Sequence, residues 1–150
     1  MENNDKTKWI NTVLSGLSEL EGSQAKIVLE KCGRECFNSS GNLEKIKKLH
    51  DDTEDKYNID LLFNLYKEKL YQNRPNLQKE NGVIYLKYEA CACGMVTQGG
   101  VTDPFLCNCT IGYTKQIFET LFGRPVRVEL IRSVLNGDGI CEQKISIPDE

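Results

Sequence analysis

Histidine is nearly absent from this chain of 150 residues, in which His50 is the one example. An imidazole is the usual general base beside a serine or cysteine nucleophile, so the composition argues against a Ser–His or Cys–His catalytic pair. Catalytic zinc sites also commonly include histidine, whereas structural zinc sites need none. His50 opens a polar stretch, residues 50–56, which we predict to be a loop with a solvated imidazole.

An excess of charge of one sign is missing as well. Residues 1–80 carry 13 Lys+Arg against 14 Asp+Glu, and residues 81–150 carry 6 against 8. Because neither part is basic, we expect neither nucleic acid nor an anionic membrane as a partner. No apolar run reaches the ~18 residues that a membrane-spanning helix needs. Residues 1–8 are polar and no apolar secretory segment follows them, so a cytoplasmic protein is expected.

Cysteine, in contrast, is abundant, with seven residues. In a reducing cytoplasm these thiols favour metal binding or thiol chemistry over a disulfide framework. A domain of this length buries roughly 70% of its unfolded surface, so it does not need disulfides in order to fold.

Two Cys-X-Cys motifs are the main candidates for chemistry. Cys91 and Cys93 are separated from Cys107 and Cys109 by a glycine-rich segment of 13 residues. Four converging thiolates suit a soft metal ion, and zinc is the expected one. The spacing differs from the Cys-X-X-Cys of zinc ribbons, and packing of these thiols as small buried hydrophobic side chains stays open as the alternative.

The position of the second motif favours thiolates. A helix is predicted from about Thr110 to Phe122, so Cys107 and Cys109 are expected just before its first turn. Free backbone N–H groups at a helix N-terminus favour negative charge and lower the pKa of a thiol. This property serves metal binding and nucleophilic attack alike.

Three further cysteines are candidates for additional ligands or pocket residues. Cys141 alternates in phase with Ile145 on a predicted strand, which indicates that it faces the interior beside the Cys-X-Cys motifs. Cys32 and Cys36 lie four residues apart on a predicted helix and face the same side. They either pack as small residues against the sheet or cover the other thiols.

The hydrophobic pattern predicts an α+β fold in a single domain, residues 1–150. Residues 6–72 have helical periodicity, and residues 83–147 are predicted to form a strand, a helix and a hairpin. We expect the N-terminal helices to pack on a small antiparallel sheet with one further helix. The predicted strands cover residues 83–88, 124–135 and 140–147, and residues 94–105 form a loop or short hairpin.

Residues 107–147 resemble the C-terminal part of the 4-vinyl reductase domain and bacterial proteins of the L-2-amino-thiazoline-4-carboxylate hydrolase-like type. The shared pattern is a strand ending in Val-Glu, a Gly-Asp turn and a cysteine before an apolar strand: Val128, Glu129, Gly137, Asp138 and Cys141. The Cys-Gly-Arg-Glu-Cys at 32–36 is similar to an early motif of some hydrolase-like members. Gln143 departs from the pattern, which has an aromatic residue there. The resemblance implies an α+β module that binds a small molecule or a metal.

Three functions stay open on the sequence. The first is a zinc-binding, small-molecule-binding domain of 4-vinyl reductase-like type, with a homodimer as one assembly to consider. The second is a hydrolase of a cyclic amide or thiazoline, with a thiolate of Cys107, Cys109 or Cys141 as the nucleophile. The third is a thiol redox switch. Zinc content separates the first function from the other two.

Overall fold

The computed structural model describes residues 3–20, 23–90 and 94–148. The N-terminal part is helical, as predicted, because apolar residues recur there at helical spacing. Its helices are α1 (Asn3–Ser18), α2 (Gln24–Asn38), α3 (Leu43–Asp52) and α4 (Ile59–Lys69).

The rest of the described chain builds a small sheet and one long helix. The strands are β1 (Leu77–Glu80), β2 (Val83–Tyr88), β3 (Arg127–Arg132) and β4 (Cys141–Ser146). They are antiparallel throughout and lie in the order β1-β2-β4-β3. Between β2 and β3 come the short helix α5 (Gly94–Thr97) and the long helix α6 (Cys107–Phe122). The α+β prediction is therefore confirmed.

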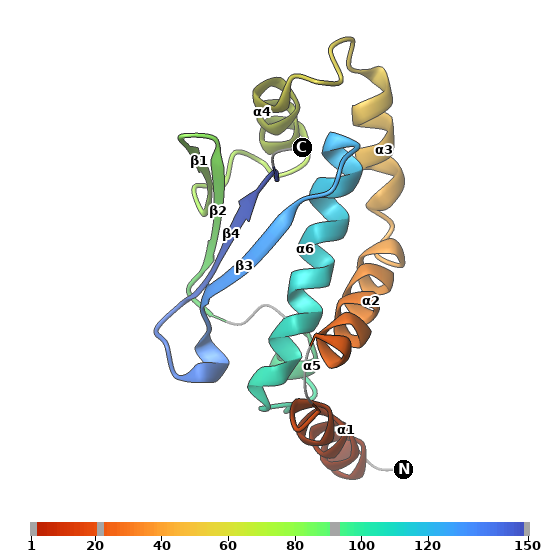
Figure 1. Cartoon of the computed structure of the whole chain (residues 1–150), viewed down its shortest axis with the longest axis vertical. Helices are drawn as coiled ribbons and strands as arrows, with labels where there is room; N and C mark the ends of the chain where they lie inside the picture. Colours follow the sequence, from red (N-terminus) through yellow and green to blue (C-terminus); the bar gives the residue numbers. More distant parts are fainter. Residues whose placement is uncertain (1–2, 21–22, 91–93, 149–150) are drawn as a thin grey trace.

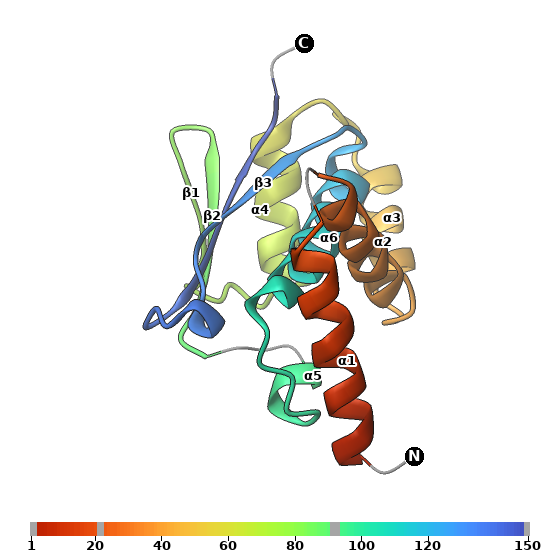
Figure 2. The same cartoon turned by 60° about the horizontal axis from the view of Figure 1, so that its bottom comes forward.

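Helix α6 is the centre of the molecule. It lies between the sheet on one side and α2 and α3 on the other (Figures 1 and 2). Its residues Phe118 and Leu121 are buried in one hydrophobic core together with Ile84 of β2 and Ile145 of β4. Residues of α4 complete this core, among them Leu62, Phe63 and Tyr66.

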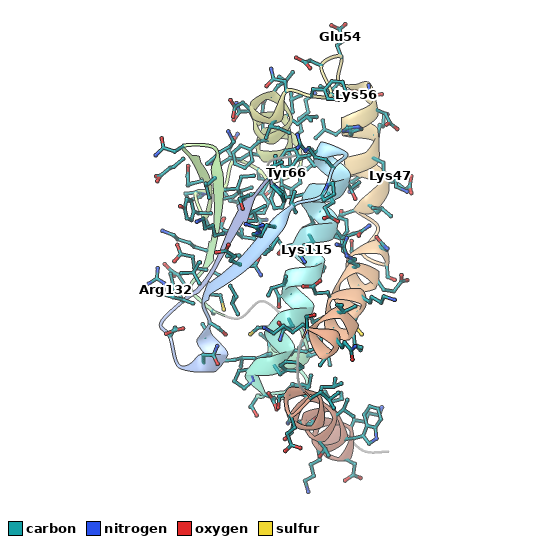
Figure 3. All side chains as sticks on the ribbon, viewed as in Figure 1. Lys47, Glu54, Lys56, Tyr66, Lys115 and Arg132 are labelled. Carbon is teal, nitrogen blue, oxygen red and sulfur yellow. The ribbon has the colours of Figure 1, made fainter. Side chains whose placement is uncertain are left out.

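Helices α2 and α6 approach each other at two glycines. A Cβ atom at Gly33 would overlap the carbonyl oxygen of Cys109, and one at Gly112 would overlap the backbone of Glu30. An ion pair at the crossing joins Glu30 to Lys115, whose position on α6 is labelled in Figure 3, with an N–O distance of 3.1 Å. The absence of a side chain at both glycines therefore allows backbone-to-backbone packing.

Several local predictions were wrong. Residues 94–105 contain the short helix α5, and the strand predicted over residues 124–135 ends at Arg132, before a 3₁₀ turn at Val134–Asn136. The strand β1 was missed, although it pairs with β2 across the turn Asn81-Gly82. Helix α6 begins at Cys107 instead of near Thr110, because a 3₁₀ turn, Pro104–Leu106, runs directly into it. Helix α3 extends to Asp52, so His50 lies in a helix and not in a loop. Among the described residues, no helix is long and apolar enough to cross a membrane.

Candidate thiol site at the β3–β4 turn

Cys107 occupies the first position of α6, on the side that faces the sheet. The 3₁₀ turn that leads into α6 is capped by Asp103, whose carboxylate accepts the N–H of Phe105 at 2.9 Å. Cys107 is buried, and its Sγ lies 3.1 Å from Oγ of Ser133. Ser133 directly follows β3 and is fully buried. The thiol of α6 therefore meets the turn that leaves the sheet.

Cys141 contacts the same turn from β4. It is the first residue of β4 and shares a face of that strand with Gln143 and Ile145, both of which are buried. Its Sγ accepts the backbone N–H of Val134 at 3.4 Å. Since Ser133 and Val134 are consecutive, the thiols of α6 and β4 contact neighbouring residues of one turn.

The turn itself is held by its own hydrogen bonds. The carboxylate of Asp138 accepts the N–H of Ser133 at 2.8 Å, and the N–H of Asp138 donates to the carbonyl of Ser133 at 3.0 Å. Gly137 has a positive φ of 92°, which other residues adopt only at a cost. Arg132, at the end of β3 (Figure 3), forms an ion pair with Glu142 of β4 at 3.0 Å. The two residues that meet the thiols thus have fixed positions.

The Cys-X-Cys motifs are described only in part. Cys91 and Cys93 lie outside the described residues. Strand β2 leads toward them, and its last residue, Tyr88, is in register with Cys141. Cys109 is half-buried beside the apolar cluster that α1 and α2 form near the start of α6. Cys107 and Cys109 are two positions apart on a helix, so their side chains do not face each other.

A buried polar pair continues the site along the interface between α6 and the sheet. Oγ1 of Thr114 donates to Oε1 of Gln143 at 2.5 Å, and both side chains are buried. Thr114 lies about two helical turns after Cys107. Further along, the same interface is apolar, with Phe118 and Ile145 in the core. The helix–sheet interface is therefore polar at the thiol end and apolar at the other.

Comparison with protein families gives one match. The sequence matches a family of unknown function (DUF6144) over residues 1–150. The chain belongs to this family. No curated protein matches the chain. The resemblance to the 4-vinyl reductase domain stays a prediction.

The remaining two thiols of the DUF6144 chain are exposed on α2. Cys32 and Cys36 line an open hollow together with their helical neighbours Lys31, Glu35 and Ser39. In the part of the chain that the structure describes, no group of three or more His, Cys, Asp or Glu side chains is placed to hold a metal ion. Cys32 and Cys36 therefore do not join Cys107 and Cys141 in such a group.

His50 lies at the far end of α6 from Cys107. Its Nδ1 is 2.8 Å from the carbonyl oxygen of Leu121, and its ring packs against the position of Gly123. The prediction of a solvated imidazole is therefore wrong. At 1.5 Å per residue, Leu121 is about 21 Å along the helix from Cys107. The histidine thus does not serve as a base for that thiol.

Sequence reasoning missed Ser133 and Thr114. Neither residue belongs to a motif, and each becomes relevant only because the packing of α6 on the sheet brings it to a thiol or an amide. Gln143 was noticed as a departure from the family pattern, and its partner Thr114 gives the physical reason for a polar residue there. A buried amide needs a hydrogen-bond partner, and the hydroxyl supplies one.

Proposed function

We propose that the protein binds a zinc ion through cysteine thiolates gathered at the β3–β4 turn. The observation that supports this proposal is the approach of two thiols, Cys107 from α6 and Cys141 from β4, to the consecutive residues Ser133 and Val134. Thiolates from separate elements that meet at one place are typical of structural zinc sites, because the metal then joins those elements.

The remaining ligands come from the Cys-X-Cys motifs. Strand β2 ends in register with Cys141, and the sequence places Cys91 three residues after its last residue, Tyr88. Cys91 and Cys93 are therefore the candidates to complete a set of four thiolates with Cys107 and Cys141. Such a Cys₄ set is closed, which favours a structural or ligand-shaping role of the zinc over a catalytic one.

The hydrogen bonds around the two thiols suit the deprotonated form. When Cys107 is a thiolate, the Ser133 hydroxyl must donate to it, and the N–H of Val134 already donates to Cys141. Hydrogen bonds donated to sulfur stabilise the thiolate and orient it for metal binding. Ser133 and Val134 thus act as supporting residues of the site.

A small-molecule ligand is the second part of the proposal. Thr114 and Gln143 provide a buried hydroxyl and a buried amide farther along the same interface, and ligand pockets use a few such groups to fix orientation. A ligand that enters from the thiol end of the α6–sheet interface would meet this pair. Heteronuclear NMR of the zinc-loaded protein with small amides and carboxylates tests this part, with Gln143→Leu as the variant expected to lose the shifts.

Elemental analysis tests the zinc proposal. Protein purified without chelator is expected to contain one zinc per chain, and Cys107→Ser and Cys141→Ser to lose most of it. Ser39→Ala, at the exposed position directly after α2, is the control and should retain the metal. Zinc-free wild-type protein that takes up no zinc at stoichiometric concentration would contradict the proposal, and one fast-reacting thiol in that protein would favour thiol chemistry instead.

A further inference from the structure

The exposed cysteines of α2 form a pair with a defined geometry. Cys32 and Cys36 are both exposed and lie four residues apart within one helix. Side chains at this spacing project from the same face, with Cβ atoms about 5–6 Å apart. Two soft ligands are therefore presented side by side at the surface, independently of the thiols at the β3–β4 turn.

The rest of α2 holds this pair in place. The helix buries a stripe at four-residue spacing, namely Ala25, Leu29, Gly33 and Phe37. Gly33 lies against the backbone of α6, and the ion pairs Glu30–Lys115 and Arg34–Glu119 stand beside the contact at 3.1 and 2.8 Å. Rotation of α2 about its axis would break these contacts, so the two thiols stay directed outward.

We propose that Cys32 and Cys36 chelate one Cu(I) ion on the surface of α2. Thiolates select soft cations such as Cu(I), whereas a structural zinc ion takes four ligands. Cu(I) can be bound by two sulfur ligands, and two thiols on one helical face supply that number. Both thiols give their protons to solvent on binding, so the two thiolates and the cation together carry a net charge of −1. Lys31 and Glu35 line the same hollow and carry opposite charges, so the charge of the chelate is left to solvent to stabilise.

The chelate explains why spacing should matter more than the number of thiols. Once one thiolate holds the ion, the second acts at a high effective concentration, which raises the affinity roughly 100-fold or more. Either Cys32→Ser or Cys36→Ser removes this advantage. Both positions are exposed, so the fold should tolerate the changes, and unchanged thermal melts of the two variants check this.

Anaerobic titration with the coloured Cu(I)–bicinchoninate complex measures the affinity. The zinc-loaded wild type is expected to take one Cu(I) per chain without releasing zinc to a metal indicator dye. The single serine variants should bind at least about 100-fold more weakly at this step. The double variant C36S/E35C keeps two thiols three residues apart on one face and should bind nearly as well as the wild type.

The decisive control is the double variant C36S/S39C. It also keeps two surface thiols, but they lie seven residues apart, about two helical turns, which is too far for one ion. It should behave like the single serine variants. Equal uptake by the wild type and C36S/S39C, or zinc release in step with Cu(I) uptake, would overturn the proposal. If the protein binds no zinc, the comparison of Cu(I) affinities among the α2 variants still tests the chelate at Cys32 and Cys36.

Discussion

At the scale of single residues, two glycines decide how closely α2 and α6 can pack. A methyl group at Gly112 would overlap the backbone of Glu30, so the helices must separate to admit it. We expect Gly112→Ala to lower the free energy of unfolding by about 1–3 kcal/mol, the usual cost of overpacking. Urea denaturation measures this change.

Gly16 provides the matched control, because it also lies in a helix but has no atom near the position of an added Cβ. Gly16→Ala should raise the free energy of unfolding by roughly 0.5–1 kcal/mol through its higher helix propensity. Equal effects of the two substitutions would mean that the helices have room to accept a methyl group at their crossing.

Tyr66 gives the protein a specific sensitivity to alkaline pH. Burial raises the pKa of this phenol above its ordinary value of 10.0. Below pH 10 the phenol is neutral in both the folded and the unfolded chain, so stability does not depend on it. Above that pH the unfolded chain loses the proton first, and stability therefore falls with rising pH until the folded pKa is reached.

Tyr66→Phe should therefore weaken the loss of stability above pH 10, as measured by urea denaturation at a series of pH values. Tyr57, which is 93% exposed, supplies the control, since Tyr57→Phe should leave the fall in stability above pH 10 unchanged. A Tyr66→Phe variant that loses as much stability above pH 10 as the wild type would show that this loss comes from other groups. Tyr88 contributes in the same direction, since burial raises its pKa as well.

At the scale of elements, the apolar spacing of the helices was predictable and two shorter signals were overlooked. Asn81 and Gly82 have φ angles of 51° and 81°, the two left-handed positions of the tight hairpin that Asn-Gly favours. The strand β1 was missed because Leu77 is its one buried residue. Asp103-Pro104 was interpreted as a loop, although Asp before Pro is also a signal for a helical start.

The hairpin yields a test of the corrected assignment. Gly82→Ala places a side chain in the left-handed region and should cost about 1–2 kcal/mol of stability. Gly139→Ala is the control, because that glycine has no positive φ and open space at its Cβ position. Urea denaturation of both variants checks this, and a Gly82→Ala variant as stable as Gly139→Ala would argue against the β1–β2 turn.

At the scale of the whole molecule, the candidate site was partly visible in the sequence. The alternation of the last strand predicted that Cys141 faces inward, and the structure places it on the face of β4 that carries Ile145. Ser133 could not be found, because its contact with Cys107 joins residues 26 positions apart and depends on how α6 packs against the sheet. The role of the Cys-X-Cys motifs stays a prediction.

If the proposed zinc is bound, stability and zinc should be coupled through Cys107, because a metal there would join α6 to the β3–β4 turn. Without zinc, Cys107→Ser should have a small effect, since the new hydroxyl can bond Oγ of Ser133 in place of the thiol at 3.1 Å. With zinc, the substitution also removes binding free energy that stabilises the fold, and the melting temperature should fall much further. Cys36→Ser, at an exposed position, should change it little.

A chelator separates these two cases. In thermal melts, EDTA should lower the melting temperature of the wild type and of Cys36→Ser by the same amount. The melting temperature of Cys107→Ser should hardly change, because this variant has no zinc to lose. The wild type in EDTA should then melt near the Cys107→Ser variant. A chelator effect that is equal in all three proteins would place any zinc away from Cys107. The absence of an effect in all three would leave the buried thiols as packing residues between helix and sheet.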